Sequence, residues 1–288
     1  MRYLVTIAAL GCVMALRVAI QAQAPAPLRL PLDNLGLEHL DIVVPDTAAS
    51  ARFYSRIFKA PLHQQPVRDT LRYFVVLGEV PPDRQVGYIA IGAAAAGRPP
   101  AIGHYCVLAR TYSPQALTAA LEAAHLPAQP TAPGPIGMWP DPDGLELQLF
   151  QPPAGLVTAA VPSPLPVAGD GFIKPLGLDH VMLDVSSLER ALPYYRGLYG
   201  AGAERPRDAN GRVWLQLERN TRIGLQTVAP GGKPAISHFA IRVEPFDRSA
   251  LTSRLRDIGA SVLTSTDEPD VVRFKDNNGI TVELRTEG

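Results

Sequence analysis

The sequence predicts an α+β protein built from two similar halves, each with a mixed sheet and a few helices. Two strands carry a histidine in nearly the same setting, "LEHLDIVV" around His39 and "LDHVMLDV" around His180, and these histidines lie 141 residues apart. The aromatic motifs "FYSRIF" and "YYRGLY" follow the two strands at the same interval. The shared order of strand, helix and aromatic pair indicates an internal duplication.

Each half continues with the same series of elements. A short amphipathic helix follows the histidine strand, with Asp46 or Ser186 as its N-terminal cap. Further strands lead to a second histidine strand, then to a second helix, and finally to a turn rich in Asp, Asn and Gly that opens the last strand. The corresponding ranges are 103–109 and 237–243 for the second histidine strands, 113–126 and 247–260 for the second helices, and 141–150 and 276–285 for the turns with their last strands.

The composition is that of a globular protein with about two domains. Hydrophobic residues make up 47% and charged residues 19% of the 288 residues, and the formal net charge is zero. There is no basic run or acidic tail, so nucleic acid is not an expected partner. The segment 153–175 is rich in proline and alanine and has no clear period, which is typical of an extended linker between two domains.

Residues 1–24 have the order of a signal peptide. Arg2 is followed by an apolar run over 4–16 and then by small residues near Ala22 and Ala24. We therefore expect a periplasmic or secreted protein that starts near residue 23–25 and has no membrane segment in its mature form. A retained N-terminal anchor and a lipoprotein attached through Cys12 are the alternatives. Removal of the leader leaves one cysteine, Cys106, so an internal disulfide is excluded.

Two histidines and one glutamate of the second half lie opposite the apolar face of their strands. Val181 and Leu183 alternate with His180 in the first strand, and "SHFAIRV" and "GITVELR" place His238 and Glu283 in the same way. His180 and His238 are the only histidines of this half of the sequence. Two neutral imidazoles and a carboxylate suit a divalent metal, with the other coordination positions left to water or substrate.

At this point the chain resembles the vicinal oxygen chelate superfamily, which includes glyoxalase I, bleomycin-resistance proteins and extradiol dioxygenases. The motifs that carry the resemblance are "LDHVMLDV", "PYYRGLYG", "SHFAIRV" and "DNNGITVEL", with their first-half counterparts "LEHLDIVVPD", "RFYSRIF", "IGHYCVLA" and "DPDGLELQL". The resemblance implies tandem domains over 35–152 and 176–287, each of paired βαβββ modules that form an open half-barrel sheet. It also implies metal ligands on the first and last strands, which are His180, His238 and Glu283.

The first half departs from this ligand pattern. The resemblance carries over to His39, His104 and Gln148, where an amide replaces the carboxylate and makes a weaker ligand. Glu146 shares the face of Gln148 but lies two residues earlier, too far along the strand to replace it without a shift. The first-half set is either a functional metal site or a degenerate one, and Cys106 is either a soft extra ligand or a packing residue.

The resemblance leaves several activities open. Extradiol dioxygenases match the layout of two domains with one His₂Glu set, which favours Fe(II) as the metal, with Zn, Mn and Ni as the others. Those enzymes carry a further histidine and a tyrosine for proton transfer, whereas the tyrosines of the second half, Tyr194, Tyr195 and Tyr199, belong to the predicted helix. A glyoxalase-like lyase or isomerase would need a fourth ligand near Gly224, with Gln226 as a shifted substitute.

A non-enzymatic binding protein and a purely structural protein with two degenerate sites are the remaining alternatives. The expected partner is a small molecule that binds through two adjacent oxygens. Arg285 shares the strand face of Glu283, so it either steadies the bound anion or lies in solvent at the rim.

Overall fold

The computed structural model describes residues 30–67, 69–80, 85–132, 136–151, 171–263 and 268–286. The predicted signal peptide 1–24 and most of the predicted linker 153–175 lie outside these residues. Strand β8 begins at Lys174, inside the range predicted as linker. None of the helices in the described ranges is long and apolar enough to cross a membrane.

The first half forms a seven-stranded mixed sheet in the order β2-β3-β4-β1-β5-β7-β6. The histidine strands β1 and β5 run antiparallel in its middle, β4 is parallel to β1, and β7 is parallel to β5. The elements are β1 Asn34–Val44, α1 Thr47–Ile57, β2 Leu62–Val67, β3 Thr70–Val80, β4 Gln85–Ala93, β5 Ala101–Ala109, α2 Pro114–Ala123, β6 Ile136–Pro140 and β7 Glu146–Phe150.

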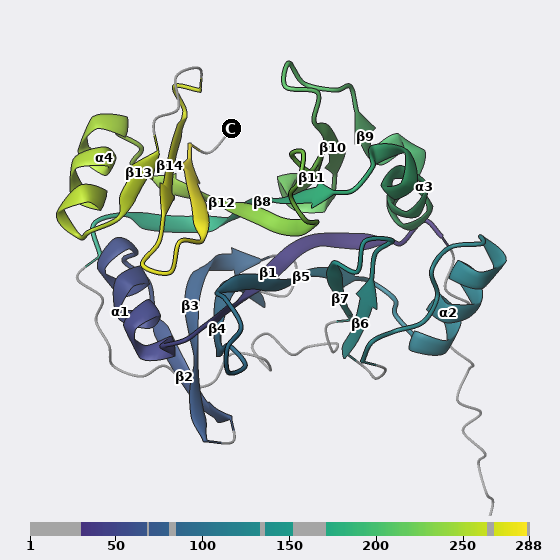
Figure 1. Cartoon of the computed structure of the whole chain (residues 1–288), viewed down its shortest axis with the longest axis horizontal. Coiled ribbons are helices and arrows are strands. Elements are labelled where there is room, and N and C mark those ends of the chain that lie inside the picture. The colour runs from purple at the N-terminus through teal and green to yellow at the C-terminus, as the bar shows by residue number, and fades with distance from the viewer. Residues whose placement is uncertain are drawn as a thin grey trace, which may run out of the picture.

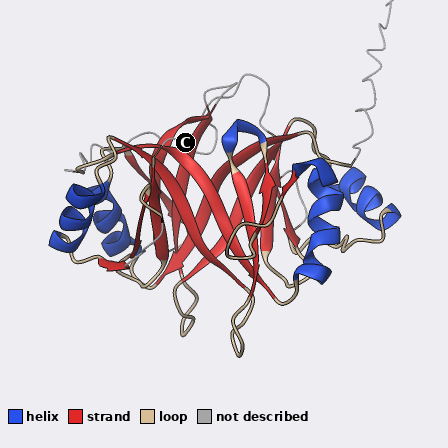
Figure 2. Cartoon of the chain, turned by 90° about the horizontal axis from the view of Figure 1, so that it is seen from above, coloured by secondary structure: helices blue, strands red, loops and turns tan. Residues whose placement is uncertain are grey.

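The second half repeats this plan in an eight-stranded sheet of order β13-β14-β15-β12-β8-β11-β10-β9. Its elements are β8 Lys174–Val185, α3 Leu188–Tyr199, β9 Glu204–Arg205, β10 Val213–Gln216, β11 Arg222–Thr227, β12 Ala235–Glu244, α4 Arg248–Asp257, β13 Ser261–Leu263, β14 Val271–Lys275 and β15 Thr281–Arg285, with 3₁₀ turns at Ala201–Ala203 and Glu218–Asn220. Figure 1 shows the two sheets one above the other. Figure 2 shows the strands in the middle and the helices at both ends. The predicted α+β class and the paired open sheets are therefore confirmed.

The helices begin where polar caps satisfy their first backbone amides. Asp46, Ser113 and Asp247 each accept a hydrogen bond from the amide three residues later. Helix α3 instead begins after Ser187, whose side chain makes no capping bond. The predicted cap Ser186 lies one residue earlier, and its amide donates to Asp143 of the first half at 2.8 Å.

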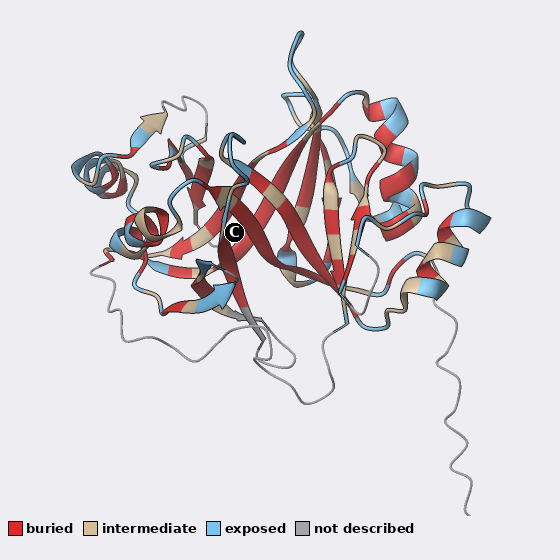
Figure 3. Cartoon of the chain, turned by 60° about the horizontal axis from the view of Figure 1, so that its bottom comes forward, coloured by how far each residue is buried: buried red, intermediate tan, exposed pale blue. Residues whose placement is uncertain are grey.

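The apolar strand faces pack on the helices and form the core. Val181, Leu183 and Val185 are fully buried, as the alternation predicted. A single cluster of buried apolar side chains includes residues of both halves. Figure 3 shows this burial along the central strands. The two sheets are therefore joined by a common core.

Equivalent turns of the two halves use the same chemistry. Gly144 and Gly279 have φ of +81° and +84°, a conformation that glycine adopts without strain. The carboxylate of Asp141 accepts from the amide of Leu145 at 2.8 Å, and the carboxylate of Asp276 accepts from the amide four residues later at 2.9 Å. Each aspartate thus closes the turn that starts the last strand of its sheet.

The same two aspartates tie each half to the helix of the other. The hydroxyl of Tyr54 in α1 donates to Asp276 at 2.9 Å, and the hydroxyl of Tyr195 in α3 donates to Asp141 at 2.9 Å. All four side chains are buried. The tyrosines of the repeated aromatic motifs therefore form a reciprocal pair of bonds across the halves.

Candidate metal centre

The second sheet brings His180, His238 and Glu283 together from three adjacent strands. They come from β8, β12 and β15, and Ala240 of β12 pairs with both His180 and Glu283, which sets all three on one face. The Nε2 atoms of the two histidines are 3.4 Å apart, and the glutamate oxygens lie 3.6 Å from His180 Nε2 and 3.2 Å from His238 Nε2. All three residues are buried.

Two of these separations fit a metal ion, and the third, 3.6 Å, is slightly longer. Two ligands about 2.1 Å from one metal lie about 3.0–3.4 Å apart at octahedral or tetrahedral angles. Burial lowers the pKa of His180 from its ordinary value to about 4, so its imidazole is neutral and its lone pair is available at neutral pH. Two imidazoles beside a buried carboxylate are the donor set expected for a divalent cation.

Asp179 orients the first of these ligands. Its carboxylate oxygen lies 2.6 Å from Nδ1 of His180, which leaves Nε2 of the ring for the metal position. Adjacent residues of a regular strand point to opposite faces, but the pairing with β12 shifts here: Ala240 pairs with His180, and the next residue, Ile241, pairs with Leu178. Asp179 is the extra residue of this β-bulge, and the bulge re-aims its side chain.

Arginines surround the carboxylates of the second site. Arg273 Nε donates to Glu283 at 2.7 Å, Arg285 lies 3.5 Å from the same carboxylate, and Arg222 bonds to Asp179. Burial alone would raise the pKa values of Glu283 and Asp179, but hydrogen bonds from the adjoining histidines and the arginine charges hold both pKa values well below the usual range. Both carboxylates are therefore ionised at neutral pH.

The position for a fourth ligand is closed. A Cβ on Gly224 would lie 2.4 Å from the Met182 side chain and 2.8 Å from the Trp214 ring. The Gln226 amide donates to Asp184 at 2.7 Å. Gln226 also pairs with Asp184 in the sheet, whereas Arg222 of the same strand pairs with His180, so Gln226 lies four residues further along the strand than the histidine. The protein therefore supplies three ligands at this site among the described residues.

The first sheet repeats the histidine pair but not the carboxylate. The Nε2 atoms of His39 and His104 are 3.3 Å apart, close to the separation in the second sheet. Gln148 occupies the register position of the second-half glutamate, and all three residues line one cavity. Glu146 instead accepts a hydrogen bond from Thr131 at 2.8 Å. The three residues predicted for the first half, His39, His104 and Gln148, thus lie together, and the third of them offers an amide instead of a carboxylate.

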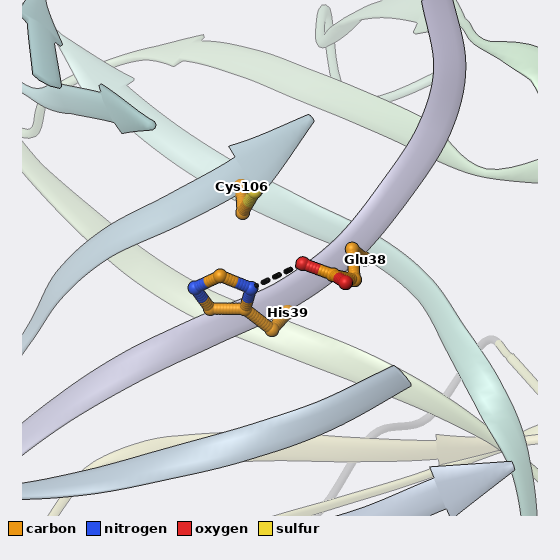
Figure 4. Close-up of side chains that lie close together, drawn as sticks. All are labelled: Glu38, His39 and Cys106. Atoms are coloured by element: carbon orange, nitrogen blue, oxygen red, sulfur yellow. Dashed lines mark hydrogen bonds and ion pairs between the residues drawn. The ribbon is translucent and has the colours of Figure 1, made fainter. Parts of the chain in front are cut away.

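His39 also belongs to a second cluster of potential ligands, together with Glu38 and Cys106 (Figure 4). The Glu38 carboxylate lies 2.7 Å from Nδ1 of His39, a hydrogen-bond distance that is short for two ligands of one metal. Glu38 therefore orients His39 as the equivalent aspartate orients the second-half histidine. Cys106 is fully buried with Leu35 and Leu108, and burial raises the pKa of its thiol.

The orienting carboxylates were missed in the sequence. Both residues immediately precede a predicted ligand, in "LEHL" and "LDHV", and this repeated acid–histidine pair is the signal that was available. Arg273 was also missed, because it reaches Glu283 from the neighbouring strand β14 rather than from its own. Arg285 lies near the carboxylates, as its strand face predicted.

No family model and no curated protein matches the chain. Among solved structures, it resembles BphC, a halotolerant catechol dioxygenase, with 18% identity, 88% of this chain and 87% of that chain covered, and a TM-score of 0.61. It resembles the 2,3-dioxygenase LapB from Pseudomonas sp. KL28 with 13% identity, 90% and 94% covered, and a TM-score of 0.63. Homoprotocatechuate 2,3-dioxygenase from Brevibacterium fuscum, in complex with 3,4-dihydroxyphenylacetate, matches with 16% identity, 92% and 84% covered, and a TM-score of 0.62.

By name, these neighbours are catechol dioxygenases and related 2,3-dioxygenases. The chain has their fold, with two tandem sheets of the βαβββ type. The predicted resemblance is therefore confirmed at the level of the fold.

Proposed function

We propose that the chain is a metal-dependent enzyme of the dioxygenase type that binds a small substrate through two adjacent oxygens. The observation that carries the proposal is the set of three mutual distances, 3.2–3.6 Å, between ligand atoms of His180, His238 and Glu283. The catechol dioxygenase fold of the structural neighbours supports the same reaction class. The substrate is a catechol or a related compound with vicinal oxygens.

The three side chains would hold a divalent metal, with Fe(II) favoured and Zn, Mn or Ni as alternatives. Bound there, the metal would supply a Lewis acid and a template for the two substrate oxygens. A site with three protein ligands leaves positions for the substrate. This arrangement disfavours a glyoxalase-like site with four protein ligands, because Gly224 and its neighbours exclude the fourth side chain.

The protein itself prepares this site in two ways. Asp179 fixes the His180 ring so that Nε2 faces Glu283 and His238, which avoids reorientation when the ligands are engaged. Trp214 forms a wall, since its ring meets the His180 ring edge-on with centroids 4.9 Å apart. This side chain shields the buried ligand from water.

The charges of the site favour an anionic substrate. Among the described residues, four arginines lie around the carboxylates of Asp179 and Glu283, namely Arg222, Arg242, Arg273 and Arg285, and one of them, Arg273, also pairs with Glu268. The arginines therefore stabilise a substrate hydroxyl in its deprotonated form, or a further anionic group of the substrate.

Metal content and turnover test the proposal together. Protein purified anaerobically without chelators should contain about one equivalent of divalent metal per second-half site. Oxygen uptake with catechols should depend on this metal and should vanish in His238→Ala. Stoichiometric metal without turnover of any vicinal-oxygen compound would instead support a binding protein, and absence of metal would support a structural role.

We also propose that the protein is exported after removal of residues 1–24. The support is the positive, apolar and small-residue order of that segment. N-terminal sequencing of native protein should find a start near residue 23–25, and a retained Met1 would contradict export with cleavage.

A further inference from the structure

A cavity of about 520 Å³ lies on the histidine side of the first sheet. Its volume is within the range of about 300–1,000 Å³ that is typical of small-molecule sites. The ring of Tyr88 stacks on His39 with centroids 4.5 Å apart, and Phe74 meets Tyr88 edge-on at 5.5 Å. Phe150 also lines the cavity. Three aromatic rings therefore line the cavity together with the His39–His104 pair.

The rim of this cavity carries exposed apolar side chains. In the part of the chain that the structure describes, the large hydrophobic residues that are exposed are Val67, Leu71 and Ile136, at 39%, 38% and 49%. Val67 and Ile136 line the cavity. Leu71 belongs to the same hairpin but pairs with Pro66, so it lies on the opposite face from Val67. Exposed apolar side chains around a cavity mark a binding surface for an apolar ligand.

The two sheets differ in charge at matching positions. In the second sheet, three arginines surround the metal centre, whereas uncharged residues take the corresponding places in the first sheet. By strand register, Arg222 corresponds to Tyr88, Arg273 to Met138, and Arg285 to Phe150.

The charged groups that remain in the first half do not favour an anion. Among the described residues that line the cavity, Arg72 is the one basic residue, and its guanidinium is paired with Asp41. The Glu38 carboxylate adds a negative charge beside His39. An anionic ligand would therefore lose its hydration without gaining a free cation.

We propose that the first half binds a second ligand, an uncharged planar aromatic compound with a hydroxyl group. The ring packs among Phe74, Tyr88 and Phe150, and the hydroxyl exchanges hydrogen bonds with the histidine pair and the Gln148 amide. This site is separate from the metal centre of the second half and does not depend on metal or turnover there.

Titration of the full-length protein with 1-naphthol tests the proposal, with the fluorescence of the naphthol as the signal. Saturable binding at one site per chain is expected. Ile136→Asp places a charge on an exposed rim residue, so the fold should be kept while naphthol affinity falls about tenfold or more. Phe74→Ala should cause a similar loss by removal of an aromatic wall.

Leu71→Asp is the control for the added charge, because Leu71 is also an exposed apolar residue, at 38% against 49% for Ile136, but its side chain lies on the face of the β2–β3 hairpin that points away from the cavity. Its naphthol affinity should stay within about twofold of the unchanged protein. Glu283→Gln should also keep naphthol binding, which separates this site from the second-half centre. The anion 1-naphthoate should bind about tenfold or more weakly than naphthol.

Three results would overturn the proposal. The first is the absence of saturable naphthol binding. The second is unchanged naphthol affinity in both Ile136→Asp and Phe74→Ala, whether or not Glu283→Gln loses affinity. The third is equal affinity for naphthoate and naphthol.

Discussion

The Asp179 carboxylate lies 2.6 Å from Nδ1 of His180, although the two residues are neighbours in one strand. The first sheet repeats the relationship, with Glu38 at 2.7 Å from Nδ1 of His39. In both sheets the strand pairing shifts at this point, so an irregularity in the ladder puts the acid and the imidazole on the same side. In both halves, a carboxylate bound to Nδ1 of the histidine thus leaves Nε2 of the ring facing the candidate site.

Loss of this orienting contact should weaken metal binding without abolishing it. We expect Asp179→Ala to lower metal affinity by about 10- to 100-fold, because the freed imidazole must be reoriented and loses basicity. Competition with a chelator of known affinity measures the change. Asp184→Ala is the control, since Asp184 lies on the same strand but bonds to Gln226. An equal loss in both variants would show that the effect is not one of orientation.

The second-half site should hold metal more tightly than the first. Glu283→Ala and His238→Ala should each remove most of the bound metal, because each leaves only two ligands in a buried site. Gln148→Ala should change total metal much less, since an amide contributes less than an anion to binding a dication. Elemental analysis of the purified variants gives the comparison, with circular dichroism to show that each is folded. Stoichiometric metal in Glu283→Ala would contradict the ranking.

Arg285 should increase the affinity of the site for substrates that carry an additional negative charge. Arg285→Met, which removes the guanidinium and keeps a long apolar chain, should weaken binding of a carboxylated catechol by about tenfold. Binding of catechol itself should change less. Titrations of metal-loaded protein followed by electronic absorption measure both affinities. Equal losses for the two ligands would indicate that Arg285 supports Glu283 rather than the substrate.

The metal-free protein should lose stability as the solution becomes acidic. Burial lowers the pKa of His180 to about 4 and, with the neighbouring histidine, the pKa of His104 to about 3. In the unfolded chain both pKa values return to about 6.5, so below that pH the unfolded state binds protons that the folded state excludes. The free energy of unfolding should therefore fall as pH is lowered from about 6.5 to about 4 for His180, and on to about 3 for His104.

Urea unfolding at a series of pH values measures this slope. His104→Gln should flatten it, whereas His125→Asn should leave it unchanged, because His125 is exposed on the loop after α2. The lowered pKa values of Glu283 and Asp179 add to the loss only below about pH 4, where carboxylates of the unfolded chain begin to protonate. A stability that does not change between pH 7 and pH 5 would contradict the prediction.

The shared strand face of the three candidate ligands could be predicted from the sequence because strand alternation is a local property. His180, His238 and Glu283 each stand opposite an apolar face, and regular strands keep that relationship. The assignment of Asp179 could not follow from the same rule, because a regular strand would place it on the face opposite its neighbour. Only the pairing with β12 reveals the extra residue.

Contacts between strands and between halves likewise could not be predicted from the alternation of residues within one strand. Arg273 acts across the sheet on Glu283, so its position depends on the register of two strands. Ser186 has the residue type of a cap, but its amide donates to Asp143 in the other half, and the helix begins one residue later. Such features are set by tertiary pairing, which single-strand periodicity does not contain.

The reciprocal bonds of Tyr54 with Asp276 and of Tyr195 with Asp141 have the symmetry of a homodimer interface. A polypeptide of one half, paired with a copy of itself, would satisfy both bonds with a single tyrosine and a single aspartate. The first helix of each copy would pack on the other copy. Each copy would thereby bury apolar surface that is exposed in the single half. Gene duplication and fusion would then have preserved an assembly that already existed, and would have freed the two histidine sites to diverge, one toward arginines and the other toward aromatic rings.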